Sequence, residues 1–284
     1  PNLINTKTNK IHTSFNQTGT ITGRLSSTKP NLQNIPIRSK EGELIREAFI
    51  PEKGNEILSV DYTQIELRLM AHFSKDEHMV KAFNKGDDIH TSTASIINNI
   101  PIEKVTKEQR YSAKAVNFGI IYGISAYGLS QNLNIPTKEA QEIITNYFNN
   151  FPDIQTFINK TIEESKKTGS IQTEFGRIRY LPDINSSNKS KRQFAERTAI
   201  NTKLQGTAAD IMKKAMIEIQ TKIETQNLSS KIIIQVHDEL VFDVTKKEKK
   251  ILIDLVTTTM ENIYPLKIPL TVDTAIGKNW KEIS

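Results

Sequence analysis

Two adjacent acidic residues, Asp238 and Glu239, lie between two apolar segments towards the end of the chain. The flanking segments, 232–236 and 240–244, are rich in β-branched and aromatic residues, which predicts two strands joined as a hairpin. Such a hairpin would hold both carboxylates at its turn on a stiff, mostly buried support. A solvated turn explains this pattern, and a metal site that takes a further carboxylate from elsewhere is the alternative.

A candidate for that further carboxylate is Asp61, which directly follows an apolar strand predicted at 57–60. From Gln64 onward the apolar spacing fits a buried helix, so Asp61 lies where a strand gives way to a helix. An aspartate at such a position often serves only as a helix N-cap. If both strands belong to one sheet, Asp61 and Asp238 can instead meet at its rim and bridge two Mg²⁺ ions, which is typical of phosphoryl transfer.

The predicted helix 108–123 carries cations and aromatic residues on one face. They recur at every fourth position: Arg110, Lys114, Phe118 and Tyr122. Two cations one turn apart suit phosphate groups, and two aromatic rings suit a nucleobase. A common amphipathic helix with solvated cations and packed aromatic residues gives the same spacing. One further helical position stands out, because Glu66 lies in an apolar stretch and burying an unpaired carboxylate is costly.

Two other segments carry side chains that suit DNA. Arg24 lies in a loop rich in Gly, Ser and Thr, which fits phosphate or sugar contacts as well as an ordinary surface loop. A long helix is predicted at about 193–226, where Arg197, Asn201 and Gln205 are spaced four residues apart. Such a ladder can read the acceptors of a DNA minor groove, although these residues are also common on helix surfaces.

Composition limits the function further. The 284 residues carry a formal net charge of +6, which suits a polyanionic partner, and contain no cysteine, which excludes disulfides and a thiol nucleophile. No apolar run approaches the ~18 residues of a membrane span, so no membrane partner is expected. The order of strands and helices predicts an α+β fold with an antiparallel sheet backed by helices. These residues alone indicate a metal-assisted phosphoryl-transfer enzyme that acts on nucleic acid.

At these positions the chain resembles the family A DNA polymerases, most closely those of the bacterial DNA polymerase I type. The resembling segments, in order, are TGRLSS, PNLQNIPIR, DYTQIELR (61–68), RYSAKAVNFGIIYG (110–123), NTKLQGTAAD and QVHDELVFDV (235–244). The resemblance implies a right-hand fold with a palm at 1–64 and 192–284 and a mainly helical fingers subdomain at 65–191. It also implies that the thumb and exonuclease-type domains precede residue 1, and that the protein is a monomer in the bacterial cytoplasm, associated with the nucleoid.

The resemblance implies a template-directed DNA polymerase core that adds dNTPs to a primer 3′-OH and releases pyrophosphate. Asp61, Asp238 and the Tyr62 carbonyl would hold two Mg²⁺ ions, for which Mn²⁺ can substitute, with Glu239 close by. Lys114 would neutralise or protonate the departing pyrophosphate, so the expected catalytic residues are Asp61, Asp238, Glu239 and Lys114.

Two further sets of residues follow from the resemblance. The expected dNTP-binding residues are Arg110, Lys114, Phe118, Tyr122, His90, Gln64 and Glu66, of which Glu66 would exclude the ribose 2′-OH. The expected contacts to primer-template DNA are Arg24, Arg197, Asn201, Gln205 and His237. A DNA-binding fragment with little or no turnover, for want of a thumb, and a metal-dependent nuclease remain alternatives.

Overall fold

The computed structural model describes residues 2–37 and 39–283. The chain forms two compact units. The first, here the sheet unit, comprises 1–63, 208–264 and 270–284, and the second, here the helical unit, comprises 64–207 and 265–269. The subdomain names and bounds expected from the resemblance stay a prediction.

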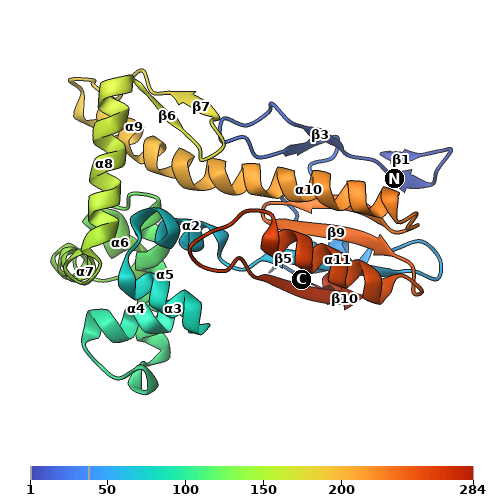
Figure 1. Ribbon diagram of the computed structural model, residues 1–284, viewed down its shortest axis with the longest axis horizontal. Coiled ribbons are helices and arrows are strands. Elements are labelled where there is room, and N and C mark those ends of the chain that lie inside the picture. The colour runs from blue at the N-terminus through green and yellow to red at the C-terminus, as the bar shows by residue number, and fades with distance from the viewer. Residues whose placement is uncertain (1, 38, 284) are drawn as a thin grey trace. The chain divides into compact units, whose positions relative to one another are not determined.

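The sheet unit is built on a four-stranded antiparallel sheet (Figure 1). Its strand order is β10 (Val272–Gly277), β5 (Glu56–Tyr62), β9 (Glu239–Val244) and β8 (Lys231–Val236). The two central strands, β5 and β9, therefore come from distant parts of the chain. The predicted α+β fold with an antiparallel sheet is confirmed.

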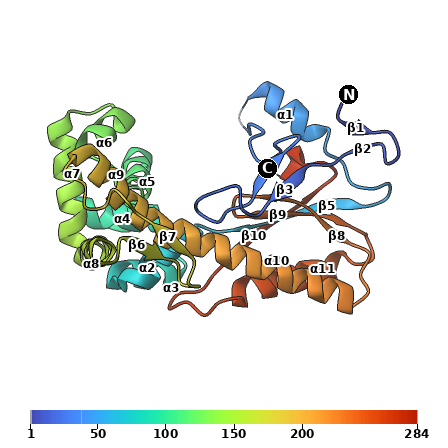
Figure 2. The ribbon, with the colours of Figure 1, turned by 90° about the horizontal axis from the view of Figure 1, so that it is seen from above.

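One face of this sheet is apolar and fully covered. Leu58 and Val60 of β5 pair with Phe242 and Leu240 of β9, and all four side chains are inaccessible to solvent. The helices α10 (Thr207–Thr225) and α11 (Lys249–Asn262) lie along this face (Figure 2). The Tyr62 hydroxyl also points this way and donates to the carbonyl of Met260 in α11 at 2.8 Å.

The opposite face is apolar at one end only. There a cluster of buried side chains joins the sheet to the C-terminal 3₁₀ helix η3 (Lys281–Ile283): Leu32, Ile57, Ile234, Val236, Val241, Trp280 and Ile283. Helix α1 (Lys40–Glu47) reaches this cluster through Arg46, whose guanidinium lies 4.2 Å from the centre of the Trp280 ring. Short strands add to this side: β1 (Ile4–Asn5), β2 (Lys10–Ile11), β3 (Ser14–Asn16) and β4 (Ser26–Thr28).

The helical unit is a set of short helices and one small hairpin. In chain order these are α2 (Ile65–Ser74), α3 (Glu77–Lys85), α4 (Ile89–Asn98), η1 (Ile102–Lys104), α5 (Lys107–Ile121), α6 (Ala126–Leu133), α7 (Thr137–Asn150), α8 (Pro152–Thr168), β6 (Ser170–Gln172), β7 (Ile178–Tyr180), α9 (Lys189–Asn201) and η2 (Thr202–Gly206). Helix α5 packs against α2, α4 and α6. A capping box fixes its start, because the Thr106 hydroxyl accepts from Gln109 N and the Gln109 side chain accepts from Thr106 N.

The helix predicted at 193–226 differs from the structure in two ways. It begins at Lys189, where the Asn188 side chain caps it, and a π-helical segment, η2, interrupts it. The Thr202 hydroxyl donates to the Thr198 carbonyl at 2.7 Å, and the Thr207 hydroxyl donates to the Lys203 carbonyl at 2.6 Å. Hydroxyls that bond a carbonyl four residues back compete with the helix ladder, and apolar periodicity does not reveal this.

Within the part of the chain that the structure describes, no helix combines the length and apolar character needed to cross a membrane.

Candidate active site

Three carboxylates lie in cross-strand positions on the polar end of the sheet. Asp61 of β5 pairs with Asp273 of β10 on one side and with Glu239 of β9 on the other. Directly opposite residues project from the same face, so the three side chains form an acidic row. Asp238 adjoins the row, since the Tyr62 amide donates to its carbonyl at 3.0 Å. Asp273 had no signal in the sequence, because only strand pairing brings it beside Asp61.

The N-cap alternative for Asp61 is wrong. Strand β5 continues through Asp61 to Tyr62, and the N-cap of α2 is Gln64, which has a left-handed conformation with φ of 54° and no side-chain capping bond. Asp61 is therefore held by the ladder of the sheet rather than by a helix start.

The electrostatics of the acidic row favour a cation. Removal from solvent, followed by repulsion from Asp238, Glu239 and Asp273, raises the pKa of Asp61 to about 7. Burial also raises the pKa of Asp238, although Arg24 and His237 act in the opposite direction. A divalent ion would relieve this repulsion, and carboxylate oxygens are the hard ligands that Mg²⁺ prefers.

The donor set fits Mg²⁺ only if other oxygens complete it. Among the described residues no group of three or more His, Cys, Asp or Glu side chains is arranged to hold a metal. Two carboxylates are nevertheless enough for Mg²⁺, which usually keeps several waters and takes other oxygens from bound phosphates.

The hairpin turn contains His237 and Asp238 only. Glu239 was expected in this turn, but it is the first residue of β9, where its carboxylate accepts from the Ser59 hydroxyl at 2.6 Å. His237 has φ of 49°, a conformation that is uncommon for residues other than glycine. The Gln235 side chain supports it by donating to the His237 carbonyl at 2.6 Å.

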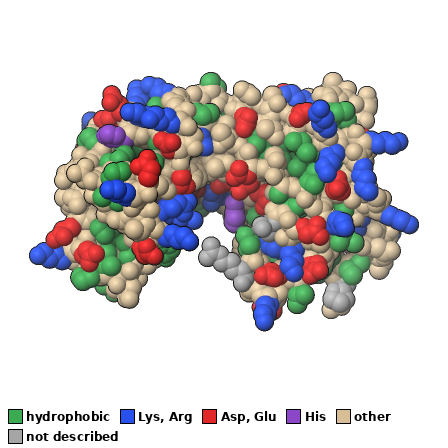
Figure 3. All heavy atoms as spheres, turned by 90° about the horizontal axis from the view of Figure 1, so that it is seen from below, with side chains coloured by type: hydrophobic (Ala, Val, Ile, Leu, Met, Phe, Trp, Pro, Cys, Tyr) green, Lys and Arg blue, Asp and Glu red, His purple; other side chains and the backbone are tan. Residues whose placement is uncertain are grey.

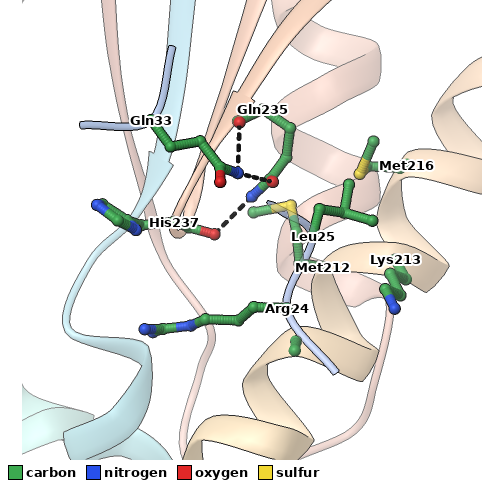
Figure 4. A pocket seen from close by; sticks show the side chains of 9 residues that line it. Arg24, Leu25, Gln33, Met212, Lys213, Met216, Gln235 and His237 are labelled. Carbon is green, nitrogen blue, oxygen red and sulfur yellow. Dashed lines mark hydrogen bonds between the residues drawn. The ribbon is translucent and has the colours of Figure 1, made fainter. Parts of the chain in front are cut away.

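A small pocket lies beside this turn (Figure 4). Gln33 donates to both the carbonyl and the side-chain oxygen of Gln235 at 3.1 Å. Arg24 approaches Asp238, with 3.7 Å between Nη2 and Oδ1. The structure therefore brings two expected DNA contacts, Arg24 and His237, to the expected metal ligand Asp238. Gln33 and Gln235 lie within the segments PNLQNIPIR and QVHDELVFDV, whose resemblance was a signal that could have identified them.

In the helical unit, Arg110 is held by an acidic partner. Its Nε and Nη2 donate to the two carboxylate oxygens of Asp88 at 3.0 and 2.8 Å. Asp88 is also the N-cap of α4, accepting from Thr91 N at 2.7 Å. Although partial burial opposes the change, hydrogen bonds from Arg110 and Thr91 lower the pKa of Asp88. The Asp88 carboxylate thus fixes the direction of the guanidinium, a role that the spacing on α5 did not reveal.

The remaining residues of the expected nucleotide face lie together. Lys114, Phe118 and Tyr122 line a cavity of about 630 Å³, together with Arg197. The Tyr122 hydroxyl donates to the Glu66 carboxylate at 2.8 Å, which supplies a partner for this buried acid.

His90 packs beside Phe118, with 5.6 Å between the ring centres. Burial, together with the positive charges of Arg110 and Lys114, lowers the pKa of His90 to about 4. The imidazole is therefore neutral at physiological pH. This matters for any ligand that it contacts, because a neutral ring has one donor and one acceptor nitrogen.

The expected ladder does not follow one regular helix. Arg197 and Asn201 belong to α9, whereas Gln205 lies in the π-helical segment η2. The Asn201 Oδ1 atom is enclosed, and among the described residues it has no hydrogen-bond donor.

On the face shown in Figure 3, basic and acidic side chains are interspersed, so the net charge of the chain does not by itself mark a nucleic-acid surface there.

We expect Gly123→Ala to displace Arg197. Gly123 has φ of +66°, and an added Cβ would lie 2.5 Å from the Arg197 Cγ atom. The matched control is Gly169→Ala, at φ of +67° with no atom within 4 Å of the added Cβ. Both variants bear the same backbone cost, so Gly123→Ala should lower the free energy of unfolding by about 1–2 kcal/mol more in urea titrations. Equal losses would contradict this packing.

We expect Asp61→Asn to stabilise the metal-free protein at high pH only. Because the folded-state pKa of Asp61 is raised, its unfavourable ionisation lowers stability as the pH rises from about 4 to about 7. Asp61 keeps exposed surface, so the gain at pH 8 should be near 1 kcal/mol, or about 2–4 °C in Tm. At pH 4 the two proteins should melt together. Asp254→Asn, on the exposed side of α11, is the control, and an unchanged Tm of Asp61→Asn at pH 8 would argue against the repulsion.

Comparison with known proteins identifies the family. The model of "DNA polymerase family A" matches residues 1–282. The chain is 48% identical over 279 residues to the DNA polymerase I of Caldicellulosiruptor bescii, covering 98% of this chain and 33% of that protein. It is 51% identical over 272 residues to the DNA polymerase I of Bacillus subtilis, covering 95% of this chain and 31% of that protein. The chain thus spans about a third of the length of these relatives.

A solved structure agrees with this assignment. It is described as "POL domain of Pol1 from M. smegmatis complex with DNA primer-template and dNTP", and it superposes with a TM-score of 0.95 at 46% identity. The match covers 99% of this chain and 50% of that chain. The α+β fold, the acidic row and the match over almost the whole chain agree with the resemblance of the motifs, and the chain belongs to DNA polymerase family A.

Proposed function

We propose that this chain is the core of a template-directed DNA polymerase that adds dNTPs to a primer 3′-OH and releases pyrophosphate. The observation that carries the proposal is the acidic row, in which strand pairing crowds Asp61 against like charges beside Asp238. Family membership supports it, as does the M. smegmatis neighbour, whose structure contains primer-template DNA and a dNTP. In this proposal the palm is 1–64 and 192–284 and the fingers are 65–191, bounds that differ from those of the sheet unit and the helical unit.

Asp61, Asp238 and the backbone carbonyl of Tyr62 would hold two Mg²⁺ ions, and Mn²⁺ can substitute for them. When bound, such ions stabilise the charge of the attacking and leaving oxygens of an in-line displacement. Asp61 must lose its proton to serve as a ligand, so metal binding should strengthen as the pH rises towards 7. Glu239, tied to Ser59, contributes negative charge close by rather than a ligand.

The exposed face of α5 would bind the triphosphate. Asp88 takes two of the N–H donors of Arg110, and the other donors of the planar guanidinium remain for phosphate oxygens. Lys114 is exposed and would neutralise or protonate the departing pyrophosphate. Phe118 would pack against the sugar and base of the incoming nucleotide.

Other residues complete the dNTP site. Tyr122 would border the templating position, and Gln64 and His90 would contact the triphosphate or its surroundings. Glu66 would exclude ribonucleotides, because a buried carboxylate held by the Tyr122 hydroxyl cannot easily withdraw from a 2′-OH.

Two groups of residues would contact primer-template DNA. Arg24 and His237, which adjoin Asp238, suit the primer terminus. Arg197, Asn201 and Gln205 suit the minor groove. The amides of Asn201 and Gln205 carry donors for the acceptors of the minor groove and acceptors for the amino group of guanine.

We expect Mg²⁺-dependent primer extension by the 284-residue chain, tested at low salt and high protein concentration. Asp61→Ala and Asp238→Ala should each lower the extension rate about a thousandfold or more, because each removes a metal ligand. Asp254→Ala is the control. Extension by the double variant would exclude these ligands, and DNA binding without extension under any metal or salt condition would favour a non-catalytic binding module.

We expect Glu66→Ala to reduce discrimination between dNTPs and rNTPs about tenfold or more, measured as the ratio of kcat/KM values. Tyr122→Phe is the matched variant, since it removes the hydrogen bond but keeps the carboxylate. A smaller loss in Tyr122→Phe than in Glu66→Ala would assign the selection to Glu66. Unchanged sugar discrimination in Glu66→Ala would rule out this role.

A further inference from the structure

Three buried polar side chains form a hydrogen-bonded chain between α4 and α5. They are Thr93, Asn117 and His90, with exposed fractions of only 1%, 1% and 2%. The Asn117 Nδ2 atom lies 3.0 Å from the Thr93 Oγ1 atom and 3.1 Å from the His90 Nδ1 atom. The expected roles on α5 leave Asn117 without a function, because it faces the core rather than the nucleotide side.

The direction of each hydrogen bond in this chain of residues follows from the bond that the Thr93 hydroxyl makes. The Thr93 Oγ1 atom lies 2.8 Å from the Ile89 carbonyl oxygen and 3.3 Å from Asn117 Oδ1, and its single hydrogen makes the shorter bond, to Ile89, so towards Asn117 its oxygen accepts. Asn117 must therefore turn its NH₂ group towards Thr93. The second hydrogen of that NH₂ group then points to His90 Nδ1, which must be the bare, accepting nitrogen.

The state of the His90 ring is thereby defined. The ring is neutral, because burial and the charges of Arg110 and Lys114 disfavour the imidazolium and outweigh the opposite effect of Asp88. A neutral imidazole with a bare Nδ1 carries its proton on Nε2. None of the described residues hydrogen-bonds Nε2, and Nε2 is not one of the enclosed polar atoms that lack a partner.

We propose that Asn117 is a positioning residue: held by Thr93, it fixes His90 with its proton on Nε2, so that His90 presents a donor to an anionic oxygen of a nucleoside triphosphate. The ligand class rests on the proposed function, whereas the position of the proton does not. A bare Nε2 would direct a lone pair at the phosphate and repel it. A neutral donor adds a hydrogen bond without adding a third positive charge to Arg110 and Lys114.

The rival arrangement is an Asn117 amide turned by 180°. Its Oδ1 would then accept a proton from His90 Nδ1, and Nε2 would become an acceptor. That arrangement would exchange the two amide atoms, so that Oδ1 would lie 3.0 Å from the Thr93 oxygen and the donor Nδ2 would lie 3.3 Å from it, a longer hydrogen bond than the present one. The two arrangements differ in which ring nitrogen carries the proton, and this can be measured directly.

The test is NMR of the chain with ¹⁵N-labelled histidine, in which bare and protonated ring nitrogens resonate in separate regions. The chain contains five histidines, and His90→Gln identifies the signals of His90. The wild type should show a bare Nδ1 and a protonated Nε2. Asn117→Asp, which replaces the donor with an acceptor of equal size, should place a proton on Nδ1. A protonated Nδ1 in the wild type, or a bare one in Asn117→Asp, would overturn the proposal.

Two variants keep this test decisive. Thr93→Val removes the hydroxyl oxygen but preserves the size of the side chain, so the amide can turn and His90 should show both tautomers even if Asn117→Asp folds poorly. If Thr93→Val shows only the wild-type tautomer of His90, Thr93 does not set the orientation of the Asn117 amide. Asn149→Asp, at an exposed position of α7, is the control for an added charge and should leave the His90 signals unchanged.

Two further measurements test the contact between His90 and the ligand. Adding dATP with Mg²⁺ should shift the Nε2 signal of the wild type but not that of Asn117→Asp. In primer extension, Asn117→Asp should raise the KM for dATP about tenfold or more and change kcat much less, because a bond to phosphate is made in both the ground and the transition state. An unchanged KM would refute the donor role. Loss of extension in the wild type, with the tautomer as described, would instead count against the proposed function.

Discussion

The antiparallel pairing of β5 with β9 and β10 sets the position of the acidic row in the sheet unit. In this register Asp61 stands opposite Glu239 on one side and Asp273 on the other. A slip of one residue would turn Asp61 to the face covered by α10 and α11 and bring Val60 or Tyr62 to the polar face. The same register also carries the apolar pairs Leu58–Phe242 and Val60–Leu240, so the site and the core are specified together.

This arrangement opposes folding locally and is tolerated because the rest of the sheet is well packed. Like charges opposite one another in a sheet are destabilising, and the raised pKa of Asp61 is the sign of that repulsion. The other face buries Leu58, Val60, Leu240 and Phe242 completely. Burial of such side chains contributes roughly 1.5–3 kcal/mol each, which offsets an acidic row that a protein without need of a cation would avoid.

In the helical unit, three side chains expected to meet a ligand are each held by a second polar residue. Asp88 holds Arg110 and Tyr122 holds Glu66, while Asn117, anchored by Thr93, holds His90. These bonds remove freedom from long or rotatable side chains before a ligand arrives, which lowers the entropy lost on binding. Helix α5 contributes both a ligand-binding side chain and a supporting one. Arg110 projects from its exposed side, whereas Asn117 projects from its buried side.

The local pattern of residue types was enough for much of this structure. The apolar arms of the hairpin, the strand before Asp61 and the periodicity of α5 are short-range features, and a fully buried strand or an amphipathic helix leaves its period in the sequence. The six motifs, in order, were enough for the family. Periodicity failed where a side chain competes with the backbone, as in the π-helical segment η2, and where the length of a turn decided whether Glu239 is in a loop or a strand.

Only the tertiary structure decided which residues support the expected ones. Asp273 joins Asp61 across 212 positions (273 − 61), Gln33 reaches Gln235 across 202, and Asn117 reaches His90 across 27. Such pairs leave no period in the chain, because they arise from strand register and helix packing rather than from local spacing. The sequence by itself therefore determined which groups could do chemistry, and the fold decided what charge, proton and direction each of them has.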